Sequence, residues 1–307
     1  MVIDLHKMLA KIKASQWALA DIDWDAPGAE MIDERQKPLL KRFMADLVWI
    51  EHIGARGFAA LALNARDDTL KEIYRYFHAE EQRHANAELA LMRRWGMLEH
   101  GEVPQPNINL QITLRVLERY GDDMPLSMLG SVIPMLEIAL DGALLKFLLD
   151  EVEDPLCHRV FDKINADEAR HLGVDFHVLE MIGGGPQLRN AVESAGVLLR
   201  PVVLAGLGLG YLPLLSHMRE SLVGMGLKAE RLHEAMNKYG QIGDRNPGIG
   251  RNPIYQLVRA HANLVVRNQA PYRLLVGVLG RASRNVSPRW LGPEPAWVRQ
   301  LTYDIAA

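Results

Sequence analysis

Apolar side chains recur every three or four positions along most of this 307-residue chain, which is the spacing of one face of an α-helix. Asp67-Asp68 and Asp154-Pro155 are typical helix starts, and Gly183-Gly184-Gly185 is a typical helix end. The helices expected in the first half are 33–65, 68–97, a shorter one at 109–120, one that opens at Pro125 and runs to about residue 151, and 155–183, with a loop at 98–108.

The remainder of the chain is also helical in pattern. An apolar helix rich in Gly and Leu is expected over 187–223, then a loop at 240–253, where Gly and Pro are frequent, then helices at 254–268 and 271–283. We therefore expect an all-α protein in two parts. Residues 1–185 form a four-helix bundle with an N-terminal helix, and residues 186–307 form a helical extension that packs on the bundle.

One polar pattern interrupts the apolar faces and occurs twice. Glu51 lies in an apolar run and is followed about thirty residues later by Glu80-Glu81-Gln82-Arg83-His84. Glu137 lies in a second apolar run and is followed at nearly the same distance by Asp167-Glu168-Ala169-Arg170-His171. In each block a Glu and a His are three positions apart, so both side chains lie on one helix face. The spacing fits two antiparallel helices, which brings the parts of each copy to one level.

The repeated residues supply four carboxylates and two imidazoles. A carboxylate buried alone is very costly, so it must lose its charge, pair, or bind a metal. Hard carboxylate oxygens mixed with imidazole suit iron or manganese, and the lack of thiolates argues against a structural zinc site. We therefore predict a site for two metal ions in the bundle, with ligands Glu51, Glu81, His84, Glu137, Glu168 and His171.

Two acidic residues and two arginines flank the predicted ligands at matching positions in the two blocks. A metal-bound His usually donates its other N–H to a carboxylate. We therefore expect Glu80 and Asp167 to reach across the bundle to the His of the opposite block, with Arg83 and Arg170 balancing their charge. The alternative is that these four residues form ordinary ion pairs on the bundle surface.

A third Glu-x-x-His motif is present at Glu230 and His233. It has no acidic residue before its Glu, and no matching Glu lies about thirty residues upstream. We interpret it as a solvated helix face.

Composition narrows the classes of protein that need to be considered. Basic residues number 35 and acidic residues 38, so nothing marks the chain as a nucleic-acid binder. The single cysteine, Cys157, excludes an internal disulfide and fits a cytoplasmic protein, with a packing role for the thiol. The N-terminus does not open into an apolar secretion signal. The most apolar run, Pro201 to Leu215, covers about fifteen residues and is too short to span a bilayer unaided.

The C-terminal part is basic, whereas the rest is acidic. From residue 251 onward the net charge is +6, and the preceding part carries −9. This polarity suggests an anionic partner, such as an acidic carrier protein, an anionic acyl substrate, another subunit or a membrane surface to which the protein binds peripherally. The alternative is that the arginines pair with the acidic bundle. The apolar helix at 197–215 is a candidate face for a homodimer or for contact with a membrane, although core packing would explain it equally well.

At these motifs the chain resembles the ferritin-like di-iron carboxylate superfamily, over about residues 45–175. The two blocks look most like the oxygen-activating branch, which includes acyl-carrier-protein desaturases, bacterial monooxygenase hydroxylases and arylamine N-oxygenases. The resemblance implies two iron ions, with Mn/Fe or two Mn as alternatives, O2 as co-substrate and an external reductase. It also implies that Glu51 and His84 bind one ion, that Glu137 and His171 bind the other, and that Glu81 and Glu168 bridge them.

The chain departs from that branch at two places. Monooxygenases and desaturases of this kind carry a Thr one turn after the third-helix Glu, where this chain has Leu140 and Asp141. Asp141 is a candidate proton donor, with a solvated side chain as the alternative. The N-oxygenases have an additional His one turn before the last Glu, where this chain has Ile164.

The leading hypothesis is a di-iron oxygenase that hydroxylates, desaturates or N-oxygenates an apolar substrate, for which an acyl chain is one candidate. Gly54 and Ala55 would leave room beside Glu51. The alternatives are a metal-storage or peroxide-handling protein of the ferritin, rubrerythrin or manganese-catalase type, an R2-like oxidase that forms a radical, and a helical scaffold without metal. Candidate pocket residues, each of which plain core packing would also explain, are Phe58, Phe77, Leu136, Leu140 and Leu144; Trp49 and Tyr74 are candidate electron relays with the same alternative.

Overall fold

The computed structural model describes residues 3–99, 101–139, 148–149 and 152–299. These residues form helices and connecting segments, and none of them is in a β-strand, so the all-α prediction is confirmed. The elements of the first half are α1 (Leu5–Ala14), η1 (Leu19–Asp21), η2 (Ala29–Met31), α2 (Lys37–Asn64), α3 (Asp68–Arg94), α4 (Ile108–Tyr120), η3 (Gly121–Asp123), α5 (Leu126–Ala139) and α7 (Pro155–Gly183).

The long helices begin where polar caps predict them. The Asp67 carboxylate accepts a hydrogen bond of 2.9 Å from the Leu70 amide at the start of α3. At the start of α7, Asp154 accepts one of 2.9 Å from the Leu156 amide, and Pro155 occupies the first turn, where its missing N–H costs nothing.

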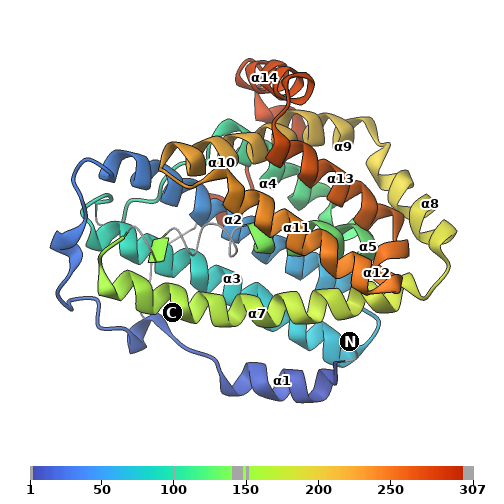
Figure 1. Ribbon diagram of the computed structural model, residues 1–307, viewed down its shortest axis with the longest axis horizontal. Helices are drawn as coiled ribbons and strands as arrows, with labels where there is room; N and C mark the ends of the chain where they lie inside the picture. Colours follow the sequence, from blue (N-terminus) through green and yellow to red (C-terminus); the bar gives the residue numbers. More distant parts are fainter. Residues whose placement is uncertain (1–2, 100, 140–147, 150–151, 300–307) are drawn as a thin grey trace.

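Four helices surround the central core. α2 packs along α3, α5 packs on α7, and further contacts join α2 to α5 and α3 to α7. Figure 1 shows α7 running the length of the molecule beside α3, with α1 at the lower edge and most of the helices after residue 186 above them. Every helix of this group therefore has a face toward the same interior.

The second half covers the other side of α4, α5 and α7. α11 and α13 pack on α5, α12 packs on α7, and the segment from α9 to η5 packs on α4. Its elements are α8 (Gln187–Leu198), α9 (Pro201–Gly206), η5 (Leu207–Tyr211), α10 (Leu212–Gly224), α11 (Ala229–Arg245), α12 (Pro247–Arg251), α13 (Pro253–Arg267), α14 (Ala270–Arg284), η6 (Pro288–Leu291) and α15 (Ala296–Arg299).

The single helix predicted over 187–223 is wrong. α8 ends at Leu198, and Arg200 has an extended backbone (φ −62°, ψ 126°) before Pro201 opens α9. The proline ring disfavours the helical conformation in the residue before it, which explains the break. Residues 207–211 then form a π-helical turn between α9 and α10.

The loop predicted over 240–253 is also wrong. α11 continues to Arg245 and α12 follows at once. Gly243 sits against the Tyr255 ring, where a Cβ would lie 2.4 Å from the nearest ring carbon. Gly248 meets Gly183 of α7, and the Gly248 and Ile249 amides donate hydrogen bonds of 3.2 and 2.9 Å to Glu180. These glycines permit close packing of helices and do not mark a loop.

Among the described residues, one helical stretch, Pro201–Gly224, is long and apolar enough to cross a membrane by length and composition alone, and 44% of its apolar window is buried inside the structure. The prediction that the apolar run at 201–215 is too short for this is therefore wrong, because the helix continues through α10 to Gly224. A core helix passes the same test when it is buried.

A buried ion pair fastens the start of α7 to the end of α3. Asp154 is fully buried and accepts hydrogen bonds of 2.8 Å from Arg94 Nε and 2.9 Å from Trp95 Nε1. Arg94 also donates to the Trp24 carbonyl at 2.7 Å. Burial would raise the pKa of Asp154, but the hydrogen bonds from Arg94, Trp95 and the Leu156 amide outweigh it and lower the pKa.

We expect Asp154→Ala to lower the free energy of unfolding by about 3–5 kcal/mol, because Arg94 would lose its buried partner. Because the folded-state pKa of Asp154 is lowered, the wild-type advantage should be complete above about pH 4 and should shrink as the pH falls further. Urea unfolding at pH 7 and at pH 3–4 measures both. Asp4→Ala removes an exposed helix cap on α1 and should cost about 1 kcal/mol or less; equal losses for the two variants would contradict this account.

Candidate metal centre

The six predicted ligands come from four helices and meet in the core. α2 carries Glu51, α5 carries Glu137, α3 carries Glu81 and His84, and α7 carries Glu168 and His171. All six side chains are buried, and both imidazoles are fully buried. Spacing of three residues on α3 and on α7 places each Glu and His on one face, as the sequence predicted.

The ligand atoms form two overlapping groups, in each of which they lie within 4.8 Å of one another. One group is Glu51, Glu81, His84 and Glu168, and the other is Glu81, Glu137, Glu168 and His171. Glu81 and Glu168 belong to both groups. The arrangement can therefore hold two cations that share two carboxylates.

Each histidine presents its Nδ1 atom to the carboxylates. His84 Nδ1 lies 3.0 Å from Glu168 Oε1 and 3.6 Å from Glu51 Oε2. His171 Nδ1 lies 3.2 Å from Glu81 Oε1 and 3.7 Å from Glu137 Oε1. Nδ1 is thus the nitrogen available to a cation on both rings.

The Nε2 atoms face the acidic residues that precede the opposite block's Glu. His84 Nε2 lies 3.0 Å from Asp167 Oδ2, and His171 Nε2 lies 2.9 Å from Glu80 Oε2. Each contact joins α3 to α7. A hydrogen bond from Nε2 to a carboxylate holds each ring with Nδ1 facing the cluster, where a bound cation would take the place of the Nδ1 proton.

Arg83 and Arg170 each contact the carboxylates of both Glu80 and Asp167. Arg170 Nη2 donates to Glu80 Oε1 at 3.2 Å and also contacts Asp167. Arg83 Nη2 lies 3.4 Å from Asp167 Oδ2 and 3.7 Å from Glu80 Oε1. The four flanking residues form one buried network behind the histidines, and the surface ion pairs considered as the alternative are not observed.

The N-terminal segment completes that network, although no sequence pattern predicted its part in it. Trp17 Nε1 donates a hydrogen bond of 2.8 Å to Asp167, and Gln16 contacts both Glu80 and Arg83. The Trp17 ring also stacks near His84, with ring centroids 6.4 Å apart. These residues lie outside the repeat, so no internal pattern could have revealed them.

The repeat itself extends one helical turn beyond the two predicted blocks. Glu88 follows His84 by four positions, and Asp175 follows His171 by four. Both carboxylates are fully buried. The Glu88 oxygens accept no hydrogen bond from the described residues, whereas Asp175 faces the Tyr74 hydroxyl. Burial, with the charge of Glu51, raises the pKa of Glu88; burial, with the charge of Glu137, raises that of Asp175.

The central groups compensate one another's charge by holding protons. Burial and the charges of Glu168 and Glu51 raise the pKa of Glu81, and burial helps to raise that of Glu137 to about 7. Burial would lower the pKa of His84 and of His171, but the surrounding carboxylates outweigh it and raise both.

A cation fits this donor set. Glu81 Oε1, His84 Nδ1 and both Glu137 oxygens are buried without a hydrogen-bond partner among the described residues, although each faces the centre of the cluster. Bare lone pairs of this kind are costly unless an ion satisfies them. Gly54 leaves space for the Glu81 carboxylate, because a Cβ there would lie 2.1 Å from Oε2.

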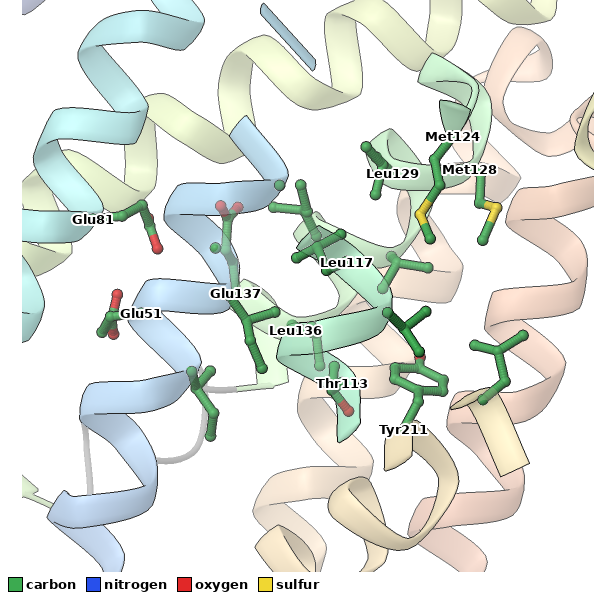
Figure 2. Close-up of a pocket in the computed structure, with 18 of the residues that line it drawn as sticks. Glu51, Glu81, Thr113, Leu117, Met124, Met128, Leu129, Leu136, Glu137 and Tyr211 are labelled. Atoms are coloured by element: carbon green, nitrogen blue, oxygen red, sulfur yellow. The ribbon is translucent and has the colours of Figure 1, made fainter. Parts of the chain in front are cut away.

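An apolar cavity of about 150 Å³ opens directly onto the shared carboxylates. Figure 2 shows Glu51, Glu81 and Glu137 at one end of it and Thr113 and Tyr211 at the other. Leu136 lines the cavity as predicted, together with residues of α4, α5, η5 and the link before α5 that the sequence did not indicate, namely Thr113, Val116, Leu117, Met124, Met128, Leu129, Leu207 and Tyr211.

The other predicted pocket residues fall elsewhere. Phe58 and Phe77 do not line the cavity; their rings pack on His171 at centroid distances of 5.0 and 4.1 Å. Asp141, Leu140 and Leu144 lie outside the described residues. Trp49 donates a hydrogen bond to the Pro104 carbonyl at 2.7 Å, which supports a packing role.

The third motif is solvated, as predicted. Glu230 and His233 are both exposed on α11. Cys157 is buried as a free thiol, and burial raises its pKa.

Comparisons with protein-family models, curated proteins and solved structures find no match to this chain.

Metal binding should release protons, because Fe(II) or Mn(II) must displace those on the two histidines and on Glu81 and Glu137. Affinity should therefore rise with pH, by about tenfold per pH unit for each proton released. Calorimetry in buffers of different ionisation enthalpy measures the number of protons. An affinity that is the same at pH 6 and at pH 8 would contradict the assignment of these ligands.

Glu88→Leu should stabilise the protein without added metal by about 1–3 kcal/mol at pH 8, since it removes a buried carboxylate that lacks hydrogen bonds. The folded-state pKa of Glu88 is raised, so the gain should shrink as the pH falls and the carboxylate becomes neutral. Chemical denaturation in a chelator measures this. Glu72→Leu, on the same helix, breaks a surface pair with Lys13 and should change stability by roughly 0.5 kcal/mol or less.

Proposed function

We propose that this protein is an O2-dependent di-iron oxidoreductase, resembling the oxygen-activating branch of the ferritin-like superfamily, that oxidises an apolar substrate. The observation that supports this most directly is the position of the apolar cavity, whose wall includes Glu51, Glu81, Glu137 and Glu168. A molecule in the cavity would lie against the cations that these carboxylates hold. Storage of hydrated ions would instead favour a polar approach to the centre.

The two ligand groups define which residues would hold the ions. Glu51 and His84 would bind one, Glu137 and His171 the other, and Glu81 and Glu168 both. When bound, the iron ions supply the reduction of O2 to an oxidant for a C–H or N–H bond, with electrons from a separate reductase.

The chain's own residues supply geometry and protection from water. Asp167 and Glu80 hold the two imidazoles in one orientation through Nε2. The Leu, Ile, Val and Met side chains of the cavity exclude water, which prevents loss of the oxidant in side reactions. Asp141 as a proton donor stays a prediction, as do a homodimer, an acidic carrier and a cytoplasmic or membrane-peripheral location.

One observation favours a second candidate, an R2-like oxidase that stores an oxidising equivalent on a tyrosine. Tyr74 is fully buried, and its ring lies 5.9 Å from Phe58 and 6.0 Å from Phe77, both of which contact His171. Its hydroxyl faces the buried Asp175 carboxylate, and burial together with that charge raises its pKa. A tyrosyl radical signal in electron paramagnetic resonance after exposure of the Fe(II) protein to O2 would favour this candidate.

The deciding experiment is metal analysis of the protein after anaerobic loading with Fe(II). We expect about two irons per chain in the wild type, loss of both in Glu81→Ala and in Glu168→Ala, and loss of about one in Glu51→Ala or Glu137→Ala, because only the first two are shared. His233→Ala removes an exposed histidine outside the cluster and should keep both irons.

Oxygen uptake with a chemical reductant then tests the reaction. The loaded wild type should consume O2 faster than Glu81→Ala does. Two manganese ions in the protein as purified, with peroxide breakdown and no O2 uptake, would favour the peroxide-handling alternative. No bound metal in a folded wild type would sink the proposal.

A further inference from the structure

The end of the cavity remote from the carboxylates carries two hydroxyl groups in an otherwise apolar lining. Thr113 projects from α4 and Tyr211 from η5, two elements that contact each other. Figure 2 shows Tyr211 away from Glu51 and Glu81, with Thr113 next to it. The cavity therefore has carboxylates at one end and two hydroxyl groups at a distance from them, in an otherwise apolar lining.

The Tyr211 hydroxyl is a free donor. It makes no hydrogen bond to any described residue, whereas its ring is held 5.5 Å from that of His261. Burial raises its pKa, so the group stays a neutral O–H at physiological pH. Thr113 already donates to the Asn109 carbonyl at 2.9 Å, which leaves its oxygen only as an acceptor. Tyr211 is thus the donor available to a molecule in the cavity.

The backbone around Tyr211 is built to place it there. Residues 207–211 form a π-helical turn, a geometry that is rare and often found at functional sites. Gly206 and Gly210 let this turn approach α4, since a Cβ at Gly206 would lie 2.2 Å from Val116 and one at Gly210 would lie 2.8 Å from Thr113 Oγ1. The extra residue in the turn sets which side chain faces the cavity.

We propose that Tyr211 binds the single polar group, an acceptor oxygen of carbonyl or hydroxyl type, of a small neutral substrate whose hydrocarbon part extends toward the shared carboxylates. The cavity volume of about 150 Å³ matches one aromatic ring or a short chain. That this molecule is a substrate rests on the proposed function, whereas the prediction that it binds in the cavity does not.

The charge of the lining decides that the ligand is neutral. Four glutamates stand at one end, and no Lys, Arg or His is among the described residues that line the cavity. A carboxylate or phosphate held at Tyr211 would lose its hydration without gaining a cationic partner, because the proposed metal ions lie at the carboxylate end. A neutral oxygen needs only the Tyr211 hydrogen bond.

Three probes of one shape test the inference: acetophenone, ethylbenzene and benzoate, titrated into the protein by calorimetry or ligand-observed NMR. The wild type should bind acetophenone more tightly than ethylbenzene and should not bind benzoate measurably. Tyr211→Phe should weaken acetophenone binding about fivefold to tenfold, to the level of ethylbenzene, and should leave ethylbenzene within about twofold.

Two further variants serve as controls. Tyr272→Phe also removes one hydroxyl, which contacts His261 at 3.1 Å away from the cavity lining, and should leave all three affinities unchanged. Met128→Trp should fill the cavity and abolish binding of both neutral probes while thermal unfolding remains cooperative. Probe binding that survives Met128→Trp in a folded protein would place the ligand elsewhere and overturn the inference.

Metal content of the same samples separates this inference from the proposed function. Ketone selectivity that depends on Tyr211 in a protein that binds no iron would keep the binding site and remove the oxidase. Two irons per chain with equal acetophenone affinity in wild type and Tyr211→Phe would overturn the inference alone.

Discussion

The structure depends on the mutual compensation of charge inside an apolar core. Four carboxylates and two imidazoles are buried within a few ångströms of one another, where an uncompensated charge is far more costly than at the surface. Apolar packing brings the four helices together, but it does not specify how far each helix is shifted along its axis. The ligand atoms specify this shift, because they meet only when α2, α3, α5 and α7 are in a single register.

A second set of contacts keeps the histidines in place. Asp167 and Glu80 lie behind the rings, and Arg83, Arg170, Trp17 and Gln16 satisfy the remaining oxygens. Because these partners come from α3, α7 and the segment after α1, the orientation of the two imidazoles depends on the packing of distant parts of the chain. Loss of the N-terminal segment would therefore disturb the orientation of the histidines, although none of its residues is a predicted ligand.

The sequence was most informative where a physical requirement leaves a repeated pattern. Glu51 and Glu137 in apolar runs, with Glu-x-x-His downstream, predicted which side chains converge, and Asp67 and Asp154 predicted two helix starts within a residue. It failed where one residue type serves two purposes. Gly243 and Gly248 suggested a loop but allow close helix packing. Tyr211, Trp17 and the cavity could not be predicted, because their positions depend on contacts between segments that are far apart in the chain, such as Trp17 with Asp167 and η5 with α4.

The crossed hydrogen bonds have a consequence for how this chain can change. Glu80 lies in the first half but orients His171 of the second, and Asp167 of the second half orients His84 of the first. Neither half therefore positions its own imidazole. A substitution at Glu80 should be compensated at His171, and one at Asp167 at His84, across more than eighty residues, and not at the histidine four positions away.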